Sequence, residues 1–134
     1  MTAVSLLQPA GLVRSPAFSH VAIIPPGATQ IHVGGQNAVD AQGTLVGPGD
    51  LVAQVDQVMA NLTVALAAAG ATMADLVSLS IALVDGTDLR AGYAAAAAQL
   101  SGTQPPPLVT AAIVAGLGVP GALIELSAIA ATVR

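Results

Sequence analysis

The chain has 134 residues, a length typical of one domain that can bury a core without disulfides or metal. Only 7% of its residues are charged while 54% are hydrophobic, and the formal net charge is -4. This composition argues against nucleic-acid binding, because three arginines, no lysine and one residue each of Tyr and Phe are too few for phosphate contacts or base stacking. We expect a single domain over residues 1–134.

Membrane and secretory segments are not expected either. Residues 91–124 carry no charge and exceed the length of a membrane helix, but glycines and prolines interrupt them. The N-terminus lacks the basic and apolar regions of a secretory signal, and the chain has no cysteine. We therefore expect a cytoplasmic protein, without membrane or nucleic-acid partners, whose apolar surface is covered by further copies of the chain.

The first part of the chain predicts short strands and turns. Residues 1–15 have no clear period, so we expect either a loose arm or an edge strand. Runs of β-favouring residues at 20–24 and 29–33 flank Pro25-Pro26-Gly27, a pattern that predicts a hairpin with a long loop. Gly34-Gly35-Gln36 ends the second run.

A long amphipathic helix is predicted after a loop rich in Gly, Asp and Pro at residues 40–50. Asp50 is its expected N-cap, and Gly70 is the residue type preferred just past a helix end. Thr72 and Asp75 then predict a short capped turn. Apolar residues recur every three or four positions, and the expected buried stripe consists of Leu51, Val55, Val58, Leu62, Leu66 and Ala69.

The second half of the chain predicts a strand, a helix and two further strands. Alanines at 94–98 favour a helix, and the triple proline at 105–107 forbids one. This order predicts an α+β fold with two helices on one face of a mixed sheet, whose other face needs a partner. The expected elements are a strand at 76–84, a helix from a cap at Thr87 or Asp88 to about Leu100, and strands at 108–114 and 122–133.

Glu125 is the only glutamate of the chain and lies between Ile124 and Leu126 in an apolar predicted strand. Strand alternation places it on the same face as Ser127, opposite its two neighbours. A carboxylate in such surroundings must reach solvent or accept hydrogen bonds, and carboxylates in such settings gather at functional sites. The simpler alternative is a residue on a solvated face or edge of the sheet.

Other polar residues give weaker signals. His20 and His32 lack nearby cysteines and have few acids near them, so we expect no metal site. Backbone N–H groups at Gly34-Gly35-Gln36 can bind an oxyanion, although two glycines more often mark a bulge or turn. Arg90 and Tyr93 share a helix face, where a solvated arginine and a packed tyrosine are the simpler interpretation. No cofactor motif is present.

Several different short motifs follow one another in a characteristic order along residues 16–133. They are Phe18-Ser19, Val33-Gly34-Gly35-Gln36, Gln57 with Asn61-Leu62, Ala67 to Gly70, Asp75-Leu76, Asp88-Leu89, Pro105-Pro106 and Ile124 to Ala130. Together they resemble the RidA/YjgF family of enamine and imine deaminases, which also carries the label L-PSP endoribonuclease.

This resemblance implies a chorismate-mutase-like subunit that assembles as a homotrimer around a central barrel of sheets. Small-molecule clefts then lie between neighbouring subunits, and no cofactor is implied. Active members hydrolyse 2-imino acids or their enamine tautomers to 2-keto acids and ammonia. In them an arginine binds the substrate carboxylate and a glutamate, matched here by Glu125, positions the attacking water.

The chain departs from this pattern at several positions. Leu108 stands where catalytic members have the arginine, and leucine cannot form charge-assisted bonds to a carboxylate, so ordinary 2-imino acids should not be recognised. Phe18 replaces a tyrosine and Tyr93 an asparagine, which predicts a more apolar pocket. Arg14, Arg90 or a paralogue in a mixed oligomer are alternative sources of the missing cation.

Two hypotheses follow for the function. The first is a hydrolase that adds water to a small imine, enamine or related carbonyl compound. The alternative is a non-catalytic small-ligand-binding or interaction trimer, which the missing arginine favours. An endoribonuclease is disfavoured because so few residues are basic. The expected site has Glu125 as catalytic residue and Phe18, Gly35, Gln36, Tyr93 and Leu108 as ligand-binding residues.

Overall fold

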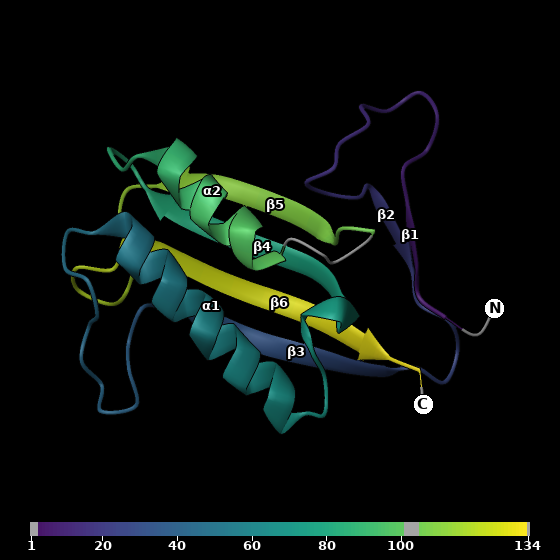
Figure 1. The fold of residues 1–134 in the computed structure, drawn as a ribbon, viewed down its shortest axis with the longest axis horizontal. Coiled ribbons are helices and arrows are strands. Elements are labelled where there is room, and N and C mark those ends of the chain that lie inside the picture. The colour runs from purple at the N-terminus through teal and green to yellow at the C-terminus, as the bar shows by residue number, and fades with distance from the viewer. Residues whose placement is uncertain (1–2, 101–104, 134) are drawn as a thin grey trace.

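The computed structural model describes residues 3–100 and 105–133 (Figure 1). The main elements are β3 Thr29–Gln36, α1 Leu51–Ala68, β4 Leu76–Val84, α2 Leu89–Leu100, β5 Leu108–Val114 and β6 Ile124–Thr132. Within the described residues, these four strands form one sheet in the order β3-β6-β4-β5. β4 and β5 are parallel, and the other neighbours are antiparallel.

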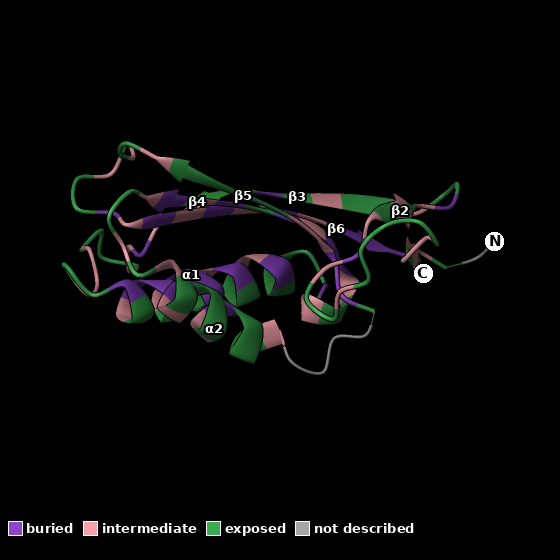
Figure 2. Cartoon of the chain, turned by 90° about the horizontal axis from the view of Figure 1, so that it is seen from above, coloured by how far each residue is buried: buried purple, intermediate pink, exposed green. Residues whose placement is uncertain are grey.

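Both helices lie on one face of this mixed sheet (Figure 2). We call the opposite face, which no described helix covers, the open face. The expected α+β fold with two helices on one face of a mixed sheet is therefore confirmed. β4 and β5 have the bounds expected from the sequence, 76–84 and 108–114, and β6 is slightly shorter than the expected strand at 122–133.

β6 is an interior strand, paired with β3 on one side and β4 on the other. Ile124 and Leu126 are buried on the helix side, whereas Glu125 and Ser127 are half-buried on the open face. The expected alternation of this strand is confirmed. The position of Glu125 is thus fixed by the pleat of a strand that is hydrogen-bonded along both edges.

α1 supplies the helix half of the core. The Asp50 carboxylate accepts a hydrogen bond from the Ala53 N–H at 3.1 Å, and Gly70 follows the helix with φ at 76°. The predicted stripe is buried except for Ala69, which is exposed because it is the C-cap, beyond the last helical turn. Gln54 and Met59, which the apolar pattern did not include, are buried as well.

α1 is also the one helix among the described residues with the length and composition to cross a bilayer. Its apolar side chains include the stripe that packs against the sheet. Core helices pass the same test of length and composition, and the packing of α1 accounts for its apolar character.

Two short connections place the later elements. Thr72 and Asp75 form the predicted capping box around the 3-10 turn η1, Met73–Asp75, directly before β4. At the start of α2, the Asp88 carboxylate accepts a hydrogen bond from the Ala91 N–H at 3.2 Å. The Thr87 hydroxyl instead donates to the Val84 carbonyl. Of the two expected caps, Asp88 is therefore the N-cap.

The predicted hairpin around Pro25 is wrong. β2, Val21–Ile23, pairs antiparallel with β1, Ser5–Leu7, while β3 pairs with β6. Pro25 and Pro26 have no N–H to donate to a ladder, and β6 offers β3 a much longer apolar partner. Of the two alternatives for residues 1–15, the short strand β1 favours the edge strand.

Candidate functional site

The predicted site residues fall into two groups on opposite faces of the sheet. Glu125 and Gly35 meet at the open face, near the start of β6 and the end of β3. Phe18 and Tyr93 line a cavity on the helix side. Leu108, the first residue of β5, faces the open side, because the next residue of the strand lines that cavity.

Gly35 leaves room for the Glu125 carboxylate. A Cβ at Gly35 would lie 3.0 Å from both Cδ and Oε1 of Glu125. The pairing of β3 with β6 shifts register between Val33 and Gln36, so the two glycines form a bulge, as the sequence favoured. The Gln36 side chain donates to the Gly34 carbonyl oxygen at 3.3 Å. Binding of a ligand oxygen by the backbone N–H groups there stays a prediction.

A buried amide fixes the chain just before Glu125. Gln54 of α1 is fully buried, and its Nε2 donates to the carbonyl oxygens of Gly47 and Gly121, each at 3.1 Å. Its Oε1 accepts a hydrogen bond from the Leu123 N–H at 2.8 Å. These contacts tie the loop before β6 to α1 and so hold the backbone that carries Glu125.

Sequence reasoning missed this role of Gln54. The available signal was a polar residue beside Val55, on the apolar stripe of a helix whose other buried members are hydrophobic. A buried polar side chain needs hydrogen-bond partners, but the sequence does not tell which backbone groups supply them.

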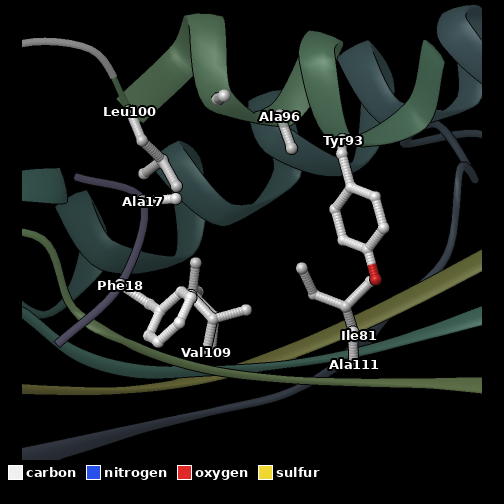
Figure 3. Close-up of a pocket in the computed structure, with 10 residues that line it drawn as sticks. Ala17, Phe18, Ile81, Tyr93, Ala96, Leu100, Val109 and Ala111 are labelled. Carbon is white, nitrogen blue, oxygen red and sulfur yellow. The ribbon is translucent and has the colours of Figure 1, made fainter. Parts of the chain in front are cut away.

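The cavity on the helix side lies between α2, β4 and β5, and we call it the α2 cavity (Figure 3). Its volume is about 380 Å³. The residues that line it are Ala17, Phe18, Leu79, Ile81, Tyr93, Ala96, Ala97, Leu100, Val109 and Ala111. It is thus an apolar site in which Phe18 and Tyr93 are the aromatic members.

Ser19 holds Phe18 close to the start of β5. Its N–H donates to the Pro107 carbonyl at 2.9 Å, and its hydroxyl donates to the Pro106 carbonyl at 2.5 Å. Ser19 also forms an isolated parallel bridge with Leu108. Phe18 and Leu108 are therefore neighbours, although their side chains belong to different faces.

Glu125 lies far from this second group within one chain. Leu108 pairs with Ser78 on β4, and Ser78 pairs with Ile129 on β6, four residues along the strand from Glu125. Two strand spacings across the sheet and four residues along it correspond to about 16 Å. One chain therefore does not bring Glu125 together with Phe18, Tyr93 and Leu108.

The two internal arginines lie away from Glu125 in the same chain. Arg90 is exposed in the first turn of α2, with the sheet between this helix and the open face. Arg14 is exposed in the segment between β1 and β2, which lies at the opposite end of the molecule from the start of β6 (Figure 1). Within residues 3–100 and 105–133, no three His, Cys, Asp or Glu side chains gather closely enough to hold a metal ion.

Comparison with known proteins gives the family. The sequence profile described as Endoribonuclease L-PSP matches residues 13–132. No curated protein matches the sequence significantly. Among solved structures, YyfB from Yersinia pestis, a protein of unknown function of the conserved Rid protein family, is 35% identical with a TM-score of 0.87, and the match covers 98% of this chain and 100% of that chain.

Two further structures agree with this comparison. YyfA from Yersinia pestis, also of the conserved Rid protein family, is 26% identical with a TM-score of 0.69, over 97% of this chain and 100% of that chain. RidA from the Antarctic bacterium Psychrobacter sp. PAMC 21119 is 27% identical with a TM-score of 0.67, over 86% and 93% of the two chains. The chain therefore belongs to the endoribonuclease L-PSP family, which is the RidA/YjgF family that its sequence motifs resemble.

Proposed function

We propose that this protein is a cytoplasmic homotrimer that adds water to a small reactive imine, enamine or related carbonyl compound in a cleft between subunits. The observation that carries the proposal is the Glu125 carboxylate, the only glutamate side chain, which projects at the open face beside a glycine that leaves it room. A carboxylate held on a paired strand can accept a proton from water at a defined position.

The separation of the two residue groups supports a shared site. Because about 16 Å of sheet separates Glu125 from Leu108 in one chain, the two act together only across a boundary between copies. In this proposal Glu125 of one copy approaches the edge strand β5 of the next, where Leu108 lies on the open face and the α2 cavity opens on the other side of the strand. A single domain over residues 1–134 then supplies one half of each of two clefts.

The proposed reaction follows from the groups available. Glu125 accepts a proton from water while the water oxygen attacks the imine carbon, and the nitrogen takes up a proton from solvent. Glu125 passes the proton it accepted to the nitrogen of the resulting carbinolamine, the hydroxyl gives its proton to solvent, and the carbon–nitrogen bond breaks, which releases ammonia and the carbonyl product. Backbone N–H groups at Gly35 and Gln36 stabilise the substrate oxygen where the substrate has one. Leu108 offers no charge to a substrate carboxylate, so ordinary 2-imino acids are poor substrates.

A non-catalytic ligand-binding trimer is the second candidate function. The observation that favours it is Leu108, which removes the cation expected at the first position of β5. Under this alternative the chain keeps the cleft and binds a small molecule without converting it.

The Glu125→Gln variant separates the two candidates. Release of ammonia from a panel of imines, with and without carboxylates, is measured for both proteins against buffer. We expect wild-type acceleration with neutral imines and a loss of roughly 10²- to 10⁴-fold in the variant, because glutamine cannot accept the proton. Thermal unfolding is the control and should change little. A wild-type protein that never exceeds buffer would leave only the binding alternative.

Mixing two inactive variants tests whether the site is shared. Glu125→Gln removes the carboxylate, and Leu108→Trp obstructs the other half of the cleft. Co-refolded in equal amounts, they should restore about a quarter of the clefts, because a neighbouring pair then supplies both intact halves. A site within one chain predicts no recovery, since every chain carries one defect.

A further inference from the structure

We infer that the α2 cavity is the pocket for an uncharged hydrocarbon group of the ligand, so that the substrate class is neutral compounds with an aromatic or branched apolar group. The assignment of this pocket to the substrate rests on the proposed function. Binding of such a group rests on the cavity alone.

The cavity arises from the sequence of α2. At the start of the helix, Gly92 packs so closely on α1 that a Cβ there would lie 3.0 Å from Leu51 Cδ2. Further along, the helix residues that border the cavity are alanines apart from Tyr93 and Leu100. Methyl groups are too short to span the space to β4 and β5, and larger side chains there would fill it.

The burial of the lining residues shows where the cavity opens. Leu79, Ile81 and Ala96 are buried and form its floor. Tyr93 and Ala111 are exposed, so the mouth lies between α2 and the edge strand β5 (Figure 3). A cavity of about 150 Å³ suffices for benzene, so about 380 Å³ holds a ring together with a short substituent.

The lining chemistry selects against charge. Among the described residues that line the cavity, none is ionised, and the Tyr93 hydroxyl is the one polar side-chain group. Figure 3 shows the Tyr93 ring pointing from α2 toward Ile81 and Ala111, with its hydroxyl at this side of the cavity. A buried carboxylate would lose its hydration with no cation to replace it, whereas one carbonyl oxygen can accept a hydrogen bond from a tyrosine.

The test uses acetophenone as a neutral probe and benzoate as its charged counterpart, in which an oxygen replaces the methyl group. Both are titrated into Glu125→Gln protein and into wild type, with the alanine methyl groups labelled for NMR. We expect saturable shifts of the Ala96, Ala97 and Ala111 methyl signals with acetophenone in both proteins. Benzoate should bind at least about tenfold more weakly.

Ala111→Leu and Ala112→Leu form a matched pair, because both residues are exposed in β5 and point to opposite faces. Filling the cavity with Ala111→Leu should weaken acetophenone binding about tenfold or more, while Ala112→Leu should leave it unchanged. Ala97→Leu, on the helix side of the cavity, gives the same test if the strand variant folds poorly.

Three results would overturn the inference: no shift at the three cavity methyl groups, equal binding of the two probes, or equal effects of the paired variants. Binding to the Glu125→Gln protein does not depend on the proposed chemistry, because this variant is expected to be inactive whether the wild type is an enzyme or a binding protein. Binding without any turnover of imines would keep the pocket and remove the enzyme. Turnover of imines without binding of acetophenone would support the enzyme and contradict the pocket.

Discussion

At the scale of single residues, the two glycines of the β3 bulge have different surroundings. Nothing lies within 4 Å of a Cβ placed on Gly34, whereas a Cβ on Gly35 would meet the Glu125 carboxylate. Neither residue has the positive φ that itself favours glycine. The need for glycine at position 35 therefore comes from the neighbouring side chain, while Gly34 is free of that constraint.

Gly34→Ala and Gly35→Ala are thus a matched pair. Alanine restricts the unfolded chain, so Gly34→Ala should raise the free energy of unfolding by about 0.5 kcal/mol. Gly35→Ala should raise the free energy of unfolding by less, because the Glu125 side chain must turn away from the new methyl group. The same displacement of the carboxylate should lower imine turnover about tenfold or more. Thermal unfolding and ammonia release measure the two effects. Equal activity of the two variants would contradict a role of the carboxylate at this position.

At the scale of elements, α1 and β6 are joined by the Gln54 side chain rather than by apolar contact alone. Its three hydrogen bonds hold Gly47, Gly121 and Leu123, which come from the loops before α1 and before β6. Because each partner is a backbone group, the contact depends on the path of the chain there.

Gln54→Met keeps the approximate volume and removes all three hydrogen bonds. The Leu123 N–H and the Gly121 carbonyl then lose this partner, whereas the Gly47 carbonyl still accepts a hydrogen bond from the Asp50 N–H, and we expect a loss of about 2 kcal/mol in the free energy of unfolding. Gln57→Met is the control, since Gln57 is half-buried and donates one hydrogen bond, to Asn61 at 2.8 Å, among the described residues. Gln57→Met should lower the free energy of unfolding by less than about 1 kcal/mol. Urea unfolding of both variants gives the comparison, and similar midpoints would show that the Gln54 contacts contribute little.

The elements themselves were largely predictable because their signals are local. Asp50, the capping box at Thr72 and the alternation around Glu125 act through neighbours in the sequence, and all three agree with the structure. Strand pairing depends on residues far apart in the chain, which is why residues 20–24 and 29–33 suggested a hairpin and yet pair with other strands.

The candidate site was predictable only in part for the same reason. An isolated glutamate in an apolar strand singled out Glu125, and motif resemblance added Phe18 and Tyr93. The apolar pocket around these two residues was predicted, but its place between α2 and the sheet was not, because that depends on how far the helix stands from the strands. The sequence also does not predict the partners of Gln54, since Gly121 and Leu123 lie more than 60 residues from it.

At the scale of the whole molecule, the open face is the surface that most needs a partner in the proposed trimer. No described helix covers it, and its β4 and β5 residues Ser80 and Thr110 are exposed in the single chain. The proposed cleft also requires Glu125 on this face to approach a neighbouring copy. Assembly and function are therefore coupled in the proposal.

Light scattering during gel filtration tests the assembly. With a chain mass of 13.0 kDa, a trimer should weigh about 39 kDa. Ser80→Arg places a cation in the middle of the open face and should shift the mass toward that of a single chain, because a charge buried without a partner is costly. Val64→Arg, at a position of α1 that is 70% exposed, is the control and should leave the mass unchanged. A wild-type mass near 13 kDa would contradict the trimer.

The strand order β3-β6-β4-β5 also sets the timing of assembly during synthesis. β6 is the last of these strands in the sequence, yet it lies between β3 and β4. Until β6 has been synthesised, β3 has no neighbour in the sheet, and the pairing that completes the sheet joins strands far apart in the sequence, so the sheet should form slowly and only after β6 is made. Because β6 also carries Glu125, a nascent chain that still lacks β6 has neither a complete sheet nor the carboxylate to offer to a neighbouring copy.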